Sequence, residues 1–91
     1  MAFATGSTLR IVLSGNITLA VAGAPLTAAS TPVKSVTLEN VNTNNVAYVG
    51  NAGAQNYALR PGATVSLDID DLNKVYVIGT VGNIITYIAV N

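Results

Sequence analysis

The chain has 91 residues, with four basic and four acidic side chains, zero net charge, and no histidine or cysteine. Disulfides are therefore excluded, and the usual metal ligands and general bases are scarce. A neutral chain also lacks the clustered positive charge that nucleic-acid binding requires. The sequence predicts a protein that is not an enzyme, with no metal, no cofactor and no nucleic-acid partner.

The composition predicts a small core and surplus apolar surface. Hydrophobic residues make up 51% of the chain and charged residues only 9%, against about 25% charged in typical domains. A chain of this length buries only about 63% of its unfolded surface. We expect the surplus to be covered in a symmetric homo-oligomer. No apolar run approaches the length of a membrane-spanning helix, so no membrane partner is predicted.

The N-terminal third predicts two strands and a turn. Apolar residues alternate with others over residues 8–13 and again over residues 17–21, which is the period of a strand. Ser14, Gly15 and Asn16 lie between them and are typical turn residues. We expect a hairpin here.

Residues 22–32 predict a loop. They are Ala, Thr, Ser, Gly and two prolines with Leu26 as the lone large apolar side chain, and proline cannot donate to a strand ladder. The chain thus divides, within a single domain, into residues 1–33, an N-terminal arm, hairpin and loop, and residues 34–91, a β core.

The remaining strands are expected wherever apolar residues alternate or form short runs. Two continuous runs, at residues 75–78 and 84–90, are expected to be buried on both faces. Arg60-Pro61-Gly62 predicts a tight turn, and residues 70–74 a short turn or helical turn. The other predicted strands are residues 34–39, 46–49 and 65–69. The predicted buried residues include Val65, Leu67, Ile69, Val77, Ile85 and Tyr87.

This pattern predicts an all-β fold. Short strands follow one another at intervals of about 8 to 12 residues with turn signals between them, which is typical of sandwiches and small barrels. We expect an antiparallel β-sandwich or jelly-roll-like barrel of seven or eight short strands.

Asp68, Asp70 and Asp71 are the local concentration of carboxylates in the chain. Counted from Asp68, the positions that an EF-hand loop requires are not filled by the required residue types. We expect Asp68 and Asp70 on a solvent face, with Asp71 capping a turn and pairing with Lys74.

Two polar residue types allow alternative interpretations. Tyr48, Tyr57, Tyr76 and Tyr87 could form a platform for a sugar or peptide, although cross-strand packing is the more common role of strand tyrosines. The asparagines concentrated in residues 40–56 are expected to adopt left-handed turn conformations.

Three segments of residues 35–91 resemble small structural proteins of tailed bacteriophages. LRPGATVSL at residues 59–67 is similar to an L-x-P-G-x-x-h-x-h turn and strand, where h is apolar. DIDDLNKVYVIGT at residues 68–80 is similar to a D-x-D-D-L-x-x-h-Y-h-x-G-T stretch. VAYVGN at residues 46–51 is similar to an hYhGN strand.

The resemblance implies a module of the virion surface. Such modules are commonly trimeric β-sandwiches or jelly-rolls seated on the major capsid protein or a neighbouring virion protein. It implies a capsid decoration (cement) protein, made in the host cytoplasm and located on the outer capsid surface. The alternatives are a base or adaptor module of a head spike or tail fibre and, from another class, a carbohydrate-binding module.

We expect the contacts with the partner protein to be made outside the segments that resemble virion proteins. Residues 1–8 and the loop at residues 22–32 lack a core-forming period, yet each contains an isolated apolar side chain, Phe3 and Leu26. Such residues can serve as anchors that become buried against a partner. We expect Phe3 and Leu26 at the partner interface, with a frayed terminus and an ordinary connection as the alternative.

Overall fold

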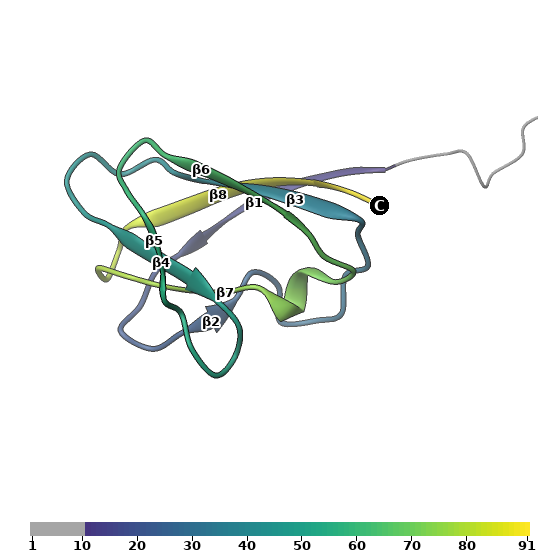
Figure 1. Cartoon of the computed structure of the whole chain (residues 1–91), viewed down its shortest axis with the longest axis horizontal. Helices are drawn as coiled ribbons and strands as arrows, with labels where there is room; N and C mark the ends of the chain where they lie inside the picture. The colour runs from purple at the N-terminus through teal and green to yellow at the C-terminus, as the bar shows by residue number, and fades with distance from the viewer. Residues whose placement is uncertain (1–10) are drawn as a thin grey trace, which may run out of the picture.

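The computed structural model describes residues 11–91, which form two four-stranded antiparallel sheets packed as a sandwich (Figure 1). The first sheet has the strand order β1-β8-β3-β6, and the second has the order β2-β7-β4-β5. The strands are β1 (Val12–Thr18), β2 (Ala24–Pro25), β3 (Ser35–Asn40), β4 (Ala47–Gly50), β5 (Tyr57–Leu59), β6 (Thr64–Asp68), β7 (Tyr76–Ile78) and β8 (Ile84–Val90), with a 3₁₀ turn, η2 (Leu72–Lys74), before β7.

The predicted all-β sandwich is confirmed, and the barrel alternative is wrong. The sheets do not close on each other, so β1 and β6 remain edges of the first sheet and β2 and β5 edges of the second. The N-terminal third contributes one edge strand to each sheet, because β1 pairs with β8 and β2 pairs with β7. The open edges are the places where backbone groups remain available to another chain.

The core lies between the two sheets and follows the strand period. In β3 the alternate residues Val36 and Leu38 are buried, as their spacing predicted. In β8 the buried residues are Ile85 and Ala89. Each sheet thus turns one face inward. The buried apolar residues are Leu19, Leu26, Val33, Val36, Leu38, Ala47, Val49, Leu59, Leu72, Val75, Val77, Ile85 and Ala89.

The hairpin predicted around Gly15 is wrong. Ser14, Gly15 and Asn16 lie in the middle of β1 and pair with β8, Gly15 directly opposite Tyr87. A Cβ added to Gly15 would lie 2.7 Å from the Tyr87 hydroxyl oxygen. The ring of Tyr87 therefore occupies the space that a side chain at position 15 would need. Pairing with β8 and this aromatic contact override the local turn preference.

The predicted buried set is confirmed only at two positions. Val77 and Ile85 are buried, whereas Val65, Leu67 and Ile69 are half-buried against the core. The reason is that β6 is an edge strand, so its inward side chains are covered from one side only. Tyr87, which lies over Gly15 of the edge strand β1, is half-buried too.

The expectation that β8 is buried on both faces is also wrong. Ile88 is 53% exposed, because the outer face of the first sheet is not covered by any described element. A continuous apolar run in this chain therefore marks a central strand, β8, with one face in the core and one face toward solvent.

The turn at Pro61 and Gly62 is confirmed. The Ala63 N–H donates to the Arg60 carbonyl over 2.9 Å, and Gly62 has a φ of 79°. Proline followed by a glycine of positive φ is the arrangement of a type II turn. This turn connects the second sheet, through β5, to the first, through β6.

The predicted left-handed asparagines are wrong. Within residues 11–91, positive φ occurs at Gly62 and Gly82 and at no other type of residue. The asparagines act through their side chains instead. The Asn51 amide oxygen accepts from the N–H groups of Gly53 and Ala54, and so closes the loop after β4.

Candidate binding surfaces

An apolar groove of about 440 Å³ opens between β6 of the first sheet and β4 and β5 of the second. Its apolar lining includes Val49, Val65, Leu67, Ile69 and Val75. It exists because β5 and β6 are edge strands, and no other strand of residues 11–91 closes the gap between the two sheets here. The same gap leaves the inward side chains of β6 half-buried.

The three segments that resemble virion proteins meet around this groove. The β4 segment contributes Val49 and Gly50, β6 contributes Val65 and Leu67, and the η2 region contributes Lys74. These segments lie apart in the sequence, and the tertiary structure brings them together. The groove offers mainly apolar contacts, and Lys74 and Tyr57 are also part of its lining. The lining contains no acidic residue.

The acidic cluster of the sequence has a structural role. Asp71 caps η2, as predicted, and its carboxylate accepts hydrogen bonds from the Ser30 hydroxyl, from the Thr31 N–H over 2.8 Å and from the Asn73 N–H over 3.0 Å. These bonds, led by that of Ser30, hold the pKa of Asp71 below its usual value of 3.8. The carboxylate thereby ties the loop before β3 to η2.

The other two carboxylates of the cluster, Asp68 and Asp70, are exposed, as predicted. The predicted pairing of Asp71 with Lys74 is wrong, because the Lys74 Nζ lies 2.8 Å from the Asp70 carboxylate instead. Both side chains of this ion pair are well exposed, so the pair contributes little stability. Among residues 11–91, acidic side chains do not gather in the groups of three or more that a metal site would need.

We predict that Asp71→Ala lowers the melting temperature at neutral pH and that the loss depends on pH. A carboxyl group whose pKa is lowered in the folded state stabilises the fold at pH values above its ordinary pKa of 3.8, and this contribution is lost as the pH falls through the folded value. The difference in melting temperature between the wild type and Asp71→Ala should therefore become smaller below about pH 3.8. Thermal unfolding from pH 7 to pH 2 measures it. Asp68→Ala is the control, and an equally wide gap at all pH values would contradict the role given to the carboxylate.

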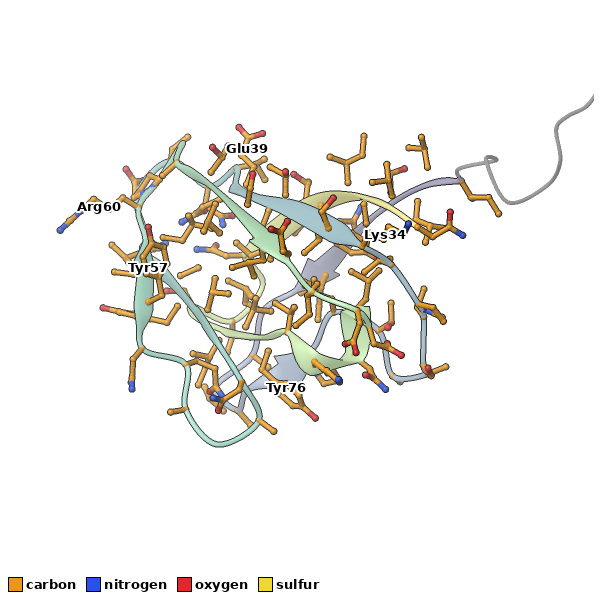
Figure 2. The ribbon with its side chains drawn as sticks, turned by 45° about the vertical axis from the view of Figure 1, so that its right-hand side comes forward. Lys34, Glu39, Tyr57, Arg60 and Tyr76 are labelled. Carbon is orange, nitrogen blue, oxygen red and sulfur yellow. The ribbon has the colours of Figure 1, made fainter. Side chains whose placement is uncertain are left out.

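The four tyrosines do not form a common platform. Tyr48, paired with Ala58 and Ile78, and Tyr76, paired with Gly50 and Pro25, belong to the outer face of the second sheet. Tyr57 lines the groove, and Tyr87 covers Gly15 in the first sheet. Figure 2 shows Tyr57 and Tyr76 well apart.

The two predicted anchors have different outcomes. Phe3 lies outside the described residues, so its role stays a prediction. Leu26 is only 6% exposed and belongs to the core of its own chain, so the expectation of a side chain left free for a partner is wrong. Its N–H donates to the Val75 carbonyl over 2.9 Å, extending the pairing of β2 beside β7. Short-range pattern could not reveal this, because the contact is made by a neighbour far along the chain.

Among residues 11–91, the charged side chains outside the group formed by Asp68, Asp70, Asp71 and Lys74 are scattered. Lys34, Glu39 and Arg60 lie on different parts of the surface (Figure 2). Among the exposed apolar residues, Val12 and Ile88 share the outer face of the first sheet, where Ile88 pairs with Ser14 and Val12 with Val90. Recognition at this surface would therefore rest on apolar contacts and backbone groups rather than on charge.

No family model matches the chain, and no curated protein matches it either. In residues 11–91, no helix has the length and apolar character needed to cross a membrane.

Proposed function

We propose that this protein is a structural component of a bacteriophage virion, a capsid decoration protein that binds the assembled head and stabilises it. One observation carries the proposal: the three segments that resemble virion surface proteins converge around a single groove of the sandwich. In this proposal the protein works by being bound, as a symmetric oligomer, to the major capsid protein or a neighbouring virion protein.

The chemistry of the surface supports a binding role. The sandwich presents exposed apolar residues, an apolar groove and open strand edges, and one member of its carboxylate cluster, Asp71, caps a turn. Several weak contacts made at once by an oligomer would give strong attachment to a lattice, because the later contacts form at high effective concentration. A spike or fibre base would use the same kinds of surface and is the alternative within this class.

Mass spectrometry of purified virions tests the proposal. We expect the protein in intact particles, in a copy number proportional to that of the major capsid protein, and in tail-less heads as well. Absence from virions would overturn the proposal. Presence only in tails or spikes would replace it with the alternative.

We also predict that the N-terminal residues contribute to attachment. Deleting residues 1–8 should leave the sandwich folded, because the described fold begins after them, while binding to capsids that lack the protein falls at least about tenfold, as expected for the loss of a buried aromatic anchor. Co-sedimentation with such capsids measures this. Phe3→Ala in the full chain tests the anchor itself, with circular dichroism as the folding control. If both variants occupied capsids as fully as the wild type, the contacts with the capsid would be made by the sandwich instead.

A further inference from the structure

Within residues 11–91, the outer edge of β1 carries backbone groups that no other strand pairs with. The ladder between β1 and β8 continues beyond β1 at both ends, where the Asn91 N–H donates to the Ile11 carbonyl over 3.2 Å and the Leu19 N–H donates to the Asn83 carbonyl over 2.7 Å. In an antiparallel ladder, alternate residues direct both backbone groups to the same neighbour. The odd residues of β1 therefore bond to β8. The even residues, from Val12 to Thr18, direct their N–H and C=O groups away from the sheet.

The other three edge strands of the sandwich are shorter than β1, and each has a feature that hinders pairing. β2 is only two residues long and contains Pro25, while β5 is three residues long and is followed by Arg60 and Pro61. β6 ends in the charged Asp68. Short edge strands, prolines and charged side chains are the usual devices that prevent edge-to-edge pairing.

β1 has none of these devices. It is seven residues long and contains no proline and no charged side chain. Its inward residues Leu13 and Ile17 are only half-buried against the core, so apolar surface next to the edge remains uncovered. A long, regular, uncharged edge with adjoining apolar surface is the kind of edge that another strand extends.

We propose that β1 pairs antiparallel with β1 of a second copy of this chain, around a twofold axis at Gly15, so that the two first sheets form one continuous eight-stranded sheet. Gly15 is the middle residue of β1, and placing the axis there overlaps the two strands along their whole length. The outward groups of the four even residues then form about eight hydrogen bonds, close to the ten or so of a standard protein interface.

This register places apolar residues beside each other on the inner face and uncharged residues beside each other on the outer face. On the inner face, Leu13 lies beside the partner's Ile17, and Ile17 beside the partner's Leu13, which covers the half-buried side chains. On the outer face, Ser14 lies beside the partner's Asn16, and the exposed Val12 beside the partner's Thr18. Since the strand carries no charge, the pairing brings no like charges together.

The twofold contact is independent of the proposed function. It gives a dimer, or an even-numbered assembly built from dimers, and differs from the trimer that the resemblance implies. A capsid protein and a protein with no connection to capsids could both use this contact. If β1 did not pair, the result expected for virions would therefore be unaffected. If the protein were absent from virions, the result expected for β1 pairing would be unaffected.

Amide hydrogen exchange of the full-length chain, resolved by residue, tests the pairing directly. In an unpaired β1, the odd residues are protected by β8, while the amides of Val12, Ser14, Asn16 and Thr18 exchange freely. In the paired strand both sets are protected, and protection of the even set falls on dilution as the dimer dissociates. Sedimentation over the same concentrations gives the assembly size.

A charge exchange tests the register. Ser14→Lys with Asn16→Lys places lysines opposite each other at two positions across the axis and should weaken the dimer about tenfold, whereas Ser14→Lys with Asn16→Glu places opposite charges together and should restore it. Both positions are exposed in the single chain. The control is Thr64→Lys with Ser66→Lys, which adds the same charge to exposed positions of β6, at the opposite edge of the same sheet. This control should leave the dimer intact.

Three results would overturn the proposal. A monomer at all concentrations with freely exchanging even amides would show that the edge stays unpaired. A trimer with freely exchanging even amides would show that the chain assembles through other surfaces. Protected even amides in a monomer would show that the N-terminal residues of the same chain cover the edge. If the double lysine variant fails to fold, the exchange pattern of the wild type and the lysine-glutamate variant still decide the question.

Discussion

Ile85→Ala is expected to destabilise the protein by about 3 to 4 kcal/mol, whereas Ile88→Ala on the same strand should change the stability by less than about 1 kcal/mol. Ile85 is completely buried, and Ile88 is 53% exposed on the outer face of the sheet. Removing buried methyl groups loses their transfer free energy and leaves a cavity that the surroundings fill only partly. At an exposed position both losses are small.

The two variants can be compared directly, because both replace isoleucine with alanine in the same strand of the same sheet. For a domain of this size the Ile85→Ala loss corresponds to a fall of roughly 20 °C in melting temperature, and it approaches the whole stability of a small protein. Denaturant unfolding at a concentration where both variants have the same oligomeric state measures the difference. Equal losses at the two positions would contradict the arrangement of β8 with one face in the core and the other toward solvent.

Asn40→Leu is expected to destabilise the protein by about 3 kcal/mol, although it replaces a polar core residue with an apolar one of similar size. Asn40 is completely buried at the end of β3. Its side-chain amide donates to the carbonyls of Asn45, over 2.9 Å, and Leu59, over 2.8 Å. Its amide oxygen accepts from the N–H and the side chain of Asn42. Leucine would leave all of these partners without their bond.

The expected loss of stability comes from the hydrogen-bond partners of Asn40 that leucine leaves unsatisfied. A buried polar group left unsatisfied costs about 1 to 3 kcal/mol, and the bond to the Leu59 carbonyl is fully buried whereas the others are partly buried. Asn44→Leu, at an exposed position of the same loop, is the matched control and should leave the stability nearly unchanged. Chemical unfolding of both variants measures the difference, and a neutral Asn40→Leu would show that this network contributes only to the shape of the loop.

The Asn40 network also explains why the clustered asparagines do not adopt the predicted left-handed conformations. Clustered asparagines suggest left-handed turn conformations, but here they bond through their side chains, and Asn42 reaches across to the backbone of Ile84. That contact joins residues 42 positions apart in the chain. A pattern restricted to neighbouring residues has no access to it.

The sequence by itself determined the features that depend on neighbouring residues. Alternation at Val36 and Leu38 placed β3 and its buried face, the apolar run at residues 84–90 placed β8, and Pro61 with Gly62 determined the turn before β6, because strand period and proline and glycine geometry are local properties. The capping role of Asp71 followed for the same reason.

Only the tertiary structure decided the features that depend on which strands lie side by side. Gly15 lies within a strand because Tyr87 covers it, Leu26 is buried because β2 lies beside β7, and Ile88 is exposed because no element in the described part of the chain covers the outer face of its sheet. The groove exists because β6 and β5 are both edges. Strand order arises from contacts between distant parts of the chain, and it decides which backbone groups and apolar faces stay open for a partner.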